Sequence, residues 1–399
     1  MKKITNKFFN QFGYEIKKCS KQKKDNKNEK LVSLKYHGNN PKGNILFSYI
    51  IDPFLVSDES AISNSHTHHW ESFAIARTFL EFGFNVDVVD YRRDTPVPIR
   101  EYHVFMGVRT NFDRITKQLN TSCLKIVHLD TAHWIKNNAA NYQRALSFQK
   151  KHRVAVNRAK LVEQNWAIEN ADCATILGNE FTIETYRYAK KKIYRVPIST
   201  CSVYPFPEHK NFNLAKNHYL WFGSTDFVHK GLDLVLDAFS EMEDYHLHIC
   251  GPIEQEKKFE TVYSEVLYNT PNIHPIGWID ITSAEFIDLC RKCVGMIYPS
   301  CSEGGGGSVI QCMHAGLIPI VSFESSVDIG SFGVELLNCT VDGIKCAVKQ
   351  VSGYSHERLL GMSHESWKFV RENHTRDAFK NSFRNILSQI LSDFSARLP

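Results

Sequence analysis

The sequence predicts an α/β protein made of two tandem domains, each with a parallel sheet covered by helices. Three observations lead to this fold class. Short apolar runs, typical of strands buried on both faces, alternate with helical patterns along the chain. Glycine follows several of these segments, where α/β units turn. A polar, proline-containing stretch over 201–217 separates one series of units from the next and predicts an interdomain linker.

The first series occupies residues 44–200. An apolar run over 44–51, a helical pattern over 70–82 and a second apolar run over 85–91 make one βαβ unit. The rest of the series predicts a helix over 181–189 and strands over 102–108, 124–129, 172–177 and 193–197. These segments predict a Rossmann-like first domain.

The second series occupies residues 218–374. Apolar runs predict strands over 218–223, 245–250, 273–276, 294–298 and 317–321. Helical patterns lie between them, and two longer ones follow over 344–351 and 357–372. We expect a second Rossmann-like domain, a cleft between the two domains, and a C-terminal helix within 375–399 that crosses back to the first.

Residues 1–43 form a basic amphipathic segment and linker. Residues 1–30 hold ten lysines and three acidic residues, and Phe8, Phe9, Phe12 and Ile16 share one helical face. One interpretation is peripheral contact with an anionic membrane, and the other is a helix docked on the protein's own surface. The lysines belong to no nucleic-acid-binding motif, so no nucleic acid partner is expected.

Composition places the chain in the cytoplasm, or on the cytosolic face of a membrane. No apolar run approaches the length of a membrane-spanning helix, and the N-terminus has no apolar secretory core. The eleven cysteines are odd in number and scattered through apolar runs, as reduced, buried thiols are.

The stretch 298–322 predicts the centre of a ligand site. It reads as strand end, four glycines, short helix from Ser308, and strand. Glycines let a ligand approach the backbone, and the free N–H groups of a helix start bind anions. Glu303 adds a carboxylate, which suits hydroxyl groups. The ligand therefore combines a phosphate-bearing part with a polyhydroxyl part.

Other predicted strand ends in the second domain add to this site. Gly223 and Ser224 follow one strand, and Lys230 precedes the next helix, where it can bind phosphate. Gly251 and Trp278 follow two further strands. Because parallel strands end at one edge of a sheet, these loops predict a cleft for a nucleotide diphosphate.

Several of these segments resemble the donor-binding half of GT-B glycosyltransferases, family 4 above all. They are Phe222-Gly223, 230–239, 249–252, and 299–322 with Glu303-Gly304 and Ala315-Gly316. The resemblance implies a metal-independent, retaining transferase that needs no cofactor. Its co-substrate would be a UDP- or GDP-linked sugar.

The resemblance also implies roles for individual residues. Glu303 would bind the donor sugar, Lys230 the phosphates, and Gly251 and Trp278 would lie near the nucleobase. His133, just past a predicted strand, would contact the sugar or the reacting centre. These roles make Glu303, His133 and Lys230 the candidate catalytic residues.

The remaining candidates line the same donor site. The backbone would approach the sugar and diphosphate at Gly304, Gly305, Gly306, Gly307 and Ser308. The family usually has a second glutamate for the ribose where this chain has Gln311, which can still hydrogen-bond hydroxyls. It often has an arginine where Ser224 and Thr225 stand, so phosphate binding would rest on Lys230 and backbone amides.

His66, His68 and His69 do not form a recognisable metal site, because helical ligand spacing and nearby partners are missing. We expect Thr67 to cap a helix that begins near His68, with Glu71 in its first turn. No bound metal is predicted.

The sequence thus predicts a retaining glycosyltransferase that moves a hexose from a nucleotide-sugar to a hydroxyl acceptor. The acceptor would be a glycan or a lipid-linked sugar, in the assembly of cell-surface polysaccharide or glycolipid. Two alternatives stay open: a non-catalytic scaffold of this fold that binds glycan or nucleotide, and a sugar-nucleotide epimerase or phosphorylase.

Overall fold

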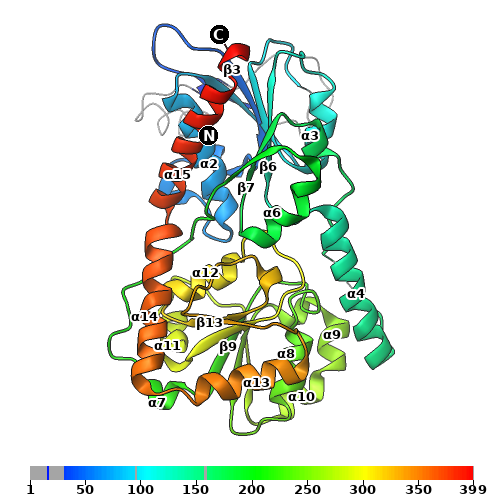
Figure 1. The fold of residues 1–399 in the computed structure, drawn as a ribbon, viewed down its shortest axis with the longest axis vertical. Coiled ribbons are helices and arrows are strands. Elements are labelled where there is room, and N and C mark those ends of the chain that lie inside the picture. Colours follow the sequence, from blue (N-terminus) through cyan, green and yellow to red (C-terminus); the bar gives the residue numbers. More distant parts are fainter. Residues whose placement is uncertain (1–15, 18–30, 95–96, 157–159, 399) are drawn as a thin grey trace.

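The computed structural model describes residues 16–17, 31–94, 97–156 and 160–398, and shows two α/β domains stacked along its long axis (Figure 1). The amphipathic segment predicted over residues 4–16 lies almost wholly outside the described residues, as do the linker over 18–30 and the membrane contact. Its last residue, Ile16, is described and belongs to a strand rather than a helix.

The first domain is built on a mixed sheet. Eight strands of the described chain follow the order β1-β2-β4-β3-β5-β6-β7-β8. They are β1 (Ile16–Lys17), β2 (Leu31–Leu34), β3 (Asn44–Tyr49), β4 (Asn85–Asp90), β5 (Val104–Gly107), β6 (Leu124–Leu129), β7 (Cys173–Ile176) and β8 (Lys192–Arg195). All neighbours from β4 to β8 are parallel, whereas β1 and β2 pair antiparallel at one edge.

The sheet therefore begins before residue 44, where a first-domain boundary was predicted. Leu31 pairs with Val89 and Leu34 with Val86. The short β2 alternates half-buried and buried side chains, and this pattern is too brief to stand out in the sequence.

Helices cover both faces of this sheet. In the first domain they are α2 (Thr67–Glu81), α3 (Arg109–Thr116), α4 (Trp134–His152), α5 (Ala167–Asn170) and α6 (Glu180–Tyr186), with 3₁₀ turns η1 (Asp52–Phe54), η2 (Glu59–Ala61) and η3 (Arg187–Ala189). The C-terminal helix α15 (Arg376–Asp393) packs on α2, where Phe379 meets Trp70 and Phe383 meets Phe79. The last helix of the chain thus completes the core of the first domain.

The second domain has a parallel six-stranded sheet within the described residues, in the order β11-β10-β9-β12-β13-β14. Its strands are β9 (His218–Phe222), β10 (His246–Cys250), β11 (Ile273–Gly277), β12 (Gly295–Tyr298), β13 (Ile318–Val321) and β14 (Val334–Glu335). Two Rossmann-like domains were predicted, and the two parallel-dominated sheets confirm this architecture.

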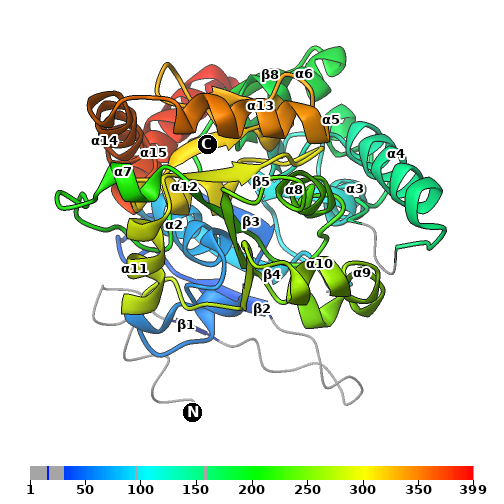
Figure 2. The same cartoon turned by 90° about the horizontal axis from the view of Figure 1, so that it is seen from below.

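Two layers of helices enclose the second sheet (Figure 2). One face packs against α8 (Leu232–Phe239), α9 (Lys257–Val262), α10 (Ser264–Asn269) and α13 (Val341–Ser352). The other packs against α11 (Ala284–Lys292), α12 (Gly307–His314) and the end of α14 (His356–Asn373). The shorter elements are α7 (Phe212–Ala215), η4 (Ile253–Gln255), η5 (Phe323–Ser325) and η6 (Ser395–Arg397). None of the described helices combines the length and the apolar composition needed to cross a membrane.

Helix α4 joins the domains and was not expected from the sequence. It leaves the first domain at its N-terminus and runs alongside the second (Figure 1). Phe148 is buried in the core of the second domain, where it stacks on Phe259. Arg144 donates a hydrogen bond of 2.7 Å to the carbonyl of Pro299. The helix therefore holds the two domains in one arrangement.

Four imidazoles lie together near the start of the second sheet, at the end opposite to its carboxyl edge. This histidine stack consists of His218, His246, His248 and His274, from three adjacent strands. Rings stack at centroid distances of 4.5 to 5.4 Å, and two nitrogen pairs lie at 3.1 Å. Burial is the main cause that lowers the pKa of His218 to about 4 and that of His248 to about 3.

Candidate active site

The strand order places the candidate site. The chain reverses its direction of winding between β9 and β12, so the loops after these two strands separate and leave a crevice at the carboxyl edge of the sheet. The loop after β9 carries Gly223 and Lys230, and the loop after β12 carries Glu303. The two most informative residues of the sequence thus flank this switch point.

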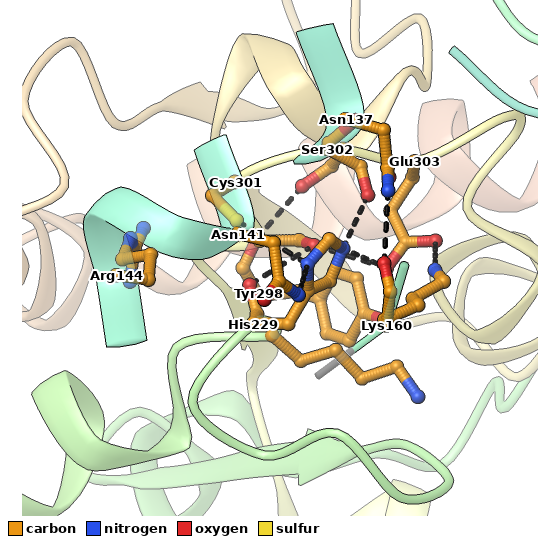
Figure 3. Close-up of polar contacts among 12 residues, drawn as sticks. Asn137, Asn141, Arg144, Lys160, His229, Tyr298, Cys301, Ser302 and Glu303 are labelled. Carbon is orange, nitrogen blue, oxygen red and sulfur yellow. Dashed lines mark hydrogen bonds and ion pairs between the residues drawn. The ribbon is translucent and has the colours of Figure 1, made fainter. Parts of the chain in front are cut away.

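Glu303 is buried and ionised. Its Oε1 accepts hydrogen bonds from Tyr298 (3.1 Å) and Ser300 (3.0 Å), and its Oε2 accepts one from Lys160 Nζ (2.6 Å), as Figure 3 shows. Burial alone raises the pKa of Glu303, but the ammonium of Lys160, with His229 and Lys230 behind it, lowers it to about 2. One carboxylate oxygen is therefore fixed by its own loop, while the other faces a side chain from the first domain.

Lys230 is buried beside this carboxylate without an ion-pair partner. Its ammonium donates to Ser224 Oγ (2.6 Å) and to the carbonyl of Thr225 (2.5 Å). Among the described residues, none of the ion pairs involves Lys230, which is 5% exposed. Burial lowers its pKa to about 8, and the neighbouring Lys160 adds to this effect. At neutral pH Lys230 remains mostly charged, and the nearby carboxylates of Glu303, Asp226 and Glu256 favour its charged form.

Two helix starts point at the same crevice. Helix α8 begins after Gly231 and α12 after Gly306, both in the left-handed conformation and both without a side-chain cap. At Gly231 a Cβ would lie 2.6 Å from the carbonyl of Pro299, so the turn requires glycine. Ser308 lies in the uncapped first turn of α12. The two helix dipoles and the N–H groups at the start of α12 thus add to the positive potential around Lys230, whereas at the start of α8 Leu232 N already donates to the carbonyl of Phe227.

The glycine loop lies close to other parts of the protein. A Cβ on Gly304 would fall 2.3 Å from the carbonyl oxygen of Asp130, in the first domain. A Cβ on Gly306 would fall 2.3 Å from Val327, and the nearest neighbour of Gly305 and Gly307 is Ile198. The space that these glycines leave open is occupied by protein, so Gly304 first of all permits close contact between the domains.

Gln311 is also engaged by protein rather than facing the crevice with free groups. Its amide oxygen accepts from Thr200 Oγ1 (3.0 Å) and Ser202 N (3.2 Å), and its nitrogen donates to Ser202 O (2.9 Å) and Tyr204 Oη (2.8 Å). The contact of Gln311 with a ribose stays a prediction. Gln311 holds the interdomain connection, because that segment crosses its face of α12.

The loops at the other two strand ends lie beside Gly223. Gly223 N donates to Cys250 O (3.0 Å), and Gly251 N donates to Gly277 O (2.9 Å). A Cβ on Gly251 would lie 2.7 Å from the carbonyl of Gly223. Trp278 follows on the rim with 73% of its surface exposed, so its indole is accessible to a flat ligand.

His133 does not reach the crevice with a free nitrogen. It is the N-cap of α4, where its Nδ1 accepts from Ile135 N (3.3 Å). Its Nε2 bonds Tyr188 Oη (3.0 Å), which itself donates to Glu169 (2.7 Å). Both ring nitrogens are thus used inside the first domain. His133 therefore caps the start of α4, and its contact with the donor sugar stays a prediction.

The first domain faces the glycine loop with Asp130 and its partner Arg109, a residue that the sequence analysis did not single out. Arg109 makes a two-point ion pair with Asp130, at 3.1 and 3.0 Å. His66 caps α2 through His68 N (3.2 Å), in place of the predicted Thr67. Desolvation lowers the pKa of His66 to about 4 although its ring is exposed.

Glu71 was expected to support the start of α2, and it has a different partner. It is wholly buried, and its Oε1 accepts from Ser199 N (2.8 Å) and Ser199 Oγ (2.9 Å) in the interdomain connection. Burial raises its pKa to about 7, against the lowering effect of these bonds. Within the described part of the chain, no group of three or more His, Cys, Asp or Glu is arranged to hold a metal ion.

The contact of α4 with the Glu303 loop also escaped sequence analysis. His229, directly before Lys230, accepts from Asn141 Nδ2 at Nδ1 (2.9 Å) and donates from Nε2 to Ser302 O (2.6 Å) (Figure 3). Burial is the main cause that lowers the pKa of His229 to about 4, so it is a neutral linker. In the sequence, the position of His229 directly before Lys230 could have indicated that His229 lies near the site.

Comparison with known proteins bears on the family and the fold. Residues 216–352 match the family model described as glycosyl transferases group 1. None of the curated proteins matches the sequence significantly. Sucrose-phosphate synthase from Thermosynechococcus elongatus is similar in structure, with a TM-score of 0.61 and 14% identity over 88% of this chain and all of that one.

Two further solved structures are similar over nearly their whole length. A glycosyltransferase from Rickettsia africae has a TM-score of 0.56 and 12% identity, covering 89% of this chain and 99% of that one. HepE from Anabaena, in complex with UDP and glucose, has a TM-score of 0.54 and 12% identity, covering 87% and 99%. The predicted resemblance to GT-B glycosyltransferases is thereby confirmed, whereas family 4 stays a prediction.

Proposed function

Because the second domain of this chain matches glycosyl transferases group 1 and the whole chain has the GT-B fold, we propose that it transfers a sugar from a nucleotide-sugar to a hydroxyl acceptor. The single observation that carries the proposal is Lys230. This buried ammonium makes no direct ion pair among the described residues, although Glu303, Asp226 and Glu256 attract it, and Lys230 directly precedes the turn at which α8 begins. A diphosphate supplies the missing negative charge.

Glu303 defines the sugar side of the proposed donor site. Its pKa of about 2 keeps it ionised at any physiological pH, and an ionised carboxylate accepts hydrogen bonds from sugar hydroxyls. The diphosphate then lies towards Lys230 and the two helix starts. The base lies towards Gly251 and Trp278.

In the reaction, the bond from the anomeric carbon to the β-phosphate oxygen breaks, and its electron pair goes to the phosphate. The acceptor oxygen forms the new bond, and its proton goes to the departing diphosphate. Negative charge therefore grows where Lys230 and the helix starts already lie, and such preorganised charge stabilises the transition state. Retention of configuration and a hexose donor belong to the proposal through the family resemblance.

HepE was solved with UDP and glucose, so UDP-glucose is the first donor to test. A panel of UDP- and GDP-sugars is incubated with glycan and lipid-linked acceptors, and NMR of the product gives its anomeric configuration. Glu303→Gln keeps shape and removes charge, and we expect it to lower turnover about 10²- to 10³-fold. The matched control is Glu335→Gln, on an exposed position of the same domain, with wild-type turnover expected.

Each outcome of this experiment has a meaning. Transfer by the wild type and loss in Glu303→Gln support the proposal. Binding without turnover by the wild type would favour the non-catalytic scaffold. Interconversion of the nucleotide-sugar without an acceptor would favour an epimerase. Equal turnover of Glu303→Gln and wild type would remove Glu303 from the site.

A further inference from the structure

Lys160 is held at the domain boundary by helix α4. Its backbone carbonyl accepts from Asn137 Nδ2 (2.8 Å). Two residues on, Val162 exchanges hydrogen bonds with the side chain of Asn138, at 2.9 and 2.8 Å. Asn137 and Asn138 of α4 thus fix the backbone at residues 160 and 162, and this backbone positions the side chain of Lys160.

The side chain of Lys160 reaches the second domain. Its ammonium lies 2.6 Å from Glu303 Oε2, between residues 143 positions apart in the chain (Figure 3). The lysine side chain is 31% exposed, whereas that of Glu303 is 11% exposed. Its charge also lowers the pKa of both Lys230 and His66, which belong to opposite walls of the cleft. Lys160 therefore lies inside the cleft, within electrostatic reach of the proposed phosphate ligand.

The two oxygens of Glu303 differ in what a ligand can displace. Oε1 is held by Tyr298 and Ser300, which belong to the same loop and are buried. Oε2 is held only by the partly exposed Lys160 among the described contacts. Hydroxyls of a bound sugar can take over Oε2 at small cost, and the ammonium is then left free beside the diphosphate.

The balance of charge between the diphosphate and the cations around it favours the release of Lys160 from Glu303. A nucleoside diphosphate brings at least two negative charges, and Lys230 offers one positive charge. The Arg109 guanidinium is already neutralised by Asp130 in a two-point ion pair. Lys160 is a further cation whose charge acts on Lys230.

We propose that Lys160 is a second diphosphate ligand of the donor site, supplied by the first domain. It pairs with Glu303 in the free protein and turns to the diphosphate when the nucleotide binds, which leaves Glu303 Oε2 to the hydroxyls of the donor sugar. This inference rests on the proposed function, and it adds a residue from the facing domain to the donor site. Donor binding is thereby coupled to the docking of α4, because α4 positions Lys160.

The test is a double-mutant cycle read by calorimetric titration with UDP, GDP and the corresponding nucleosides. Lys160→Met should weaken nucleoside diphosphate binding about tenfold or more, as loss of a charged hydrogen bond does, and leave nucleoside binding unchanged. Lys160→Arg should restore most of the affinity. The matched control is Lys151→Met, which breaks another ion pair between α4 and the second domain, with Asp237, on the exposed side.

The cycle separates contact from an indirect effect through Glu303. If Lys160 touches the diphosphate, Lys160→Met still weakens UDP or GDP binding about tenfold in a Glu303→Gln background. If Lys160 acts only by neutralising Glu303, the loss disappears in that background, and the inference is overturned. Equal weakening by Lys151→Met would overturn it as well, because α4 docking alone would then explain the effect. Failure of the wild type to bind either diphosphate would refute the proposed function itself.

Discussion

Replacing Lys230 by methionine should make the protein more stable and destroy its nucleotide site. The ammonium is 5% exposed, and burial is the main cause that lowers its pKa from 10.5 to about 8. A lowered pKa of a lysine means that the folded state disfavours its charge. The lysine is therefore maintained at the expense of stability, which is typical of functional rather than structural residues.

The magnitude follows from the pKa. Each unit corresponds to 1.36 kcal/mol, so burial of the charge costs about 3 kcal/mol below pH 8. Methionine removes this cost and loses the bonds to Ser224 and Thr225, worth about 1 kcal/mol together because Ser224 is exposed and can bind water. We expect the free energy of unfolding to rise by about 1 to 2 kcal/mol at pH 7.

The stability difference between wild type and Lys230→Met should depend on pH. Above pH 8 the folded wild type releases the lysine proton while the unfolded chain keeps it up to about pH 10.5, so wild-type stability rises over this range relative to the variant. The advantage of Lys230→Met should therefore shrink between pH 8 and 10.5. Urea unfolding at several pH values measures the effect, with Lys349→Met on the exposed face of α13 as control.

Titration of the variant with UDP and GDP completes the experiment. We expect no measurable binding of either nucleotide, because its diphosphate would be buried without the ammonium of Lys230. A variant that unfolds more easily than the wild type and still binds the nucleotide would refute the reasoning. Lys230 would then be a structural lysine that stabilises the loop after β9.

Two further predictions concern pH. Glu71 keeps its proton in the folded state up to pH 7 but loses it above pH 4.5 when unfolded, so its contribution to stability falls by about 3 kcal/mol as pH rises over this range. In urea titrations Glu71→Gln, which can still accept from Ser199, should therefore be more stable than wild type at pH 8 and equal to it near pH 4. Equal stabilities at pH 8 would contradict the raised pKa of Glu71. The pKa of His248 in the histidine stack is lowered to about 3, so stability is lost as pH falls below 6.5. In His248→Phe the free energy of unfolding should therefore fall less steeply with decreasing pH than in the wild type. An unchanged slope would show that the histidine stack does not limit stability in acid.

The fold class was predictable from the sequence because it rests on local signals. Buried parallel strands read as apolar runs, and 218–223, 245–250 and 317–321 were all placed within about two residues of β9, β10 and β13. Helix α12 was recognised between the glycine loop and Gly316, whose φ of +74° demands glycine. The importance of the loop after β12 could likewise be predicted, because Glu303 and the four glycines over 304–307 are contiguous in the sequence.

Helix α4 was missed because its pattern is weak. Only Asn137, Asn141 and Phe148 of its 19 residues are buried, and two of these are polar. Its partners lie in the other domain, so its stability comes from tertiary contacts that local periodicity does not encode. The polar side chains of α4 are explained by what they bind, and what they bind is 88 positions away for Asn141 and His229.

The hydrogen-bond partners of His133 and Gln311 were not predicted, for a related reason. Both stand at the place along the chain where a ligand contact was expected, yet one caps α4 and the other holds the interdomain connection. Position relative to a strand end predicts the neighbourhood of a side chain. It does not predict which of several hydrogen-bond partners the side chain meets.

The sequence by itself determined two α/β units, the carboxyl-edge loops and the identities of Lys230 and Glu303, because strand periodicity and turn glycines are local properties of the chain. Only the tertiary structure decided that Lys160 meets Glu303, that Lys230 makes no direct ion pair among the described residues, and that α4 joins the domains. Electrostatic energy depends on distance through space, and distances between residues more than 100 positions apart are set by packing.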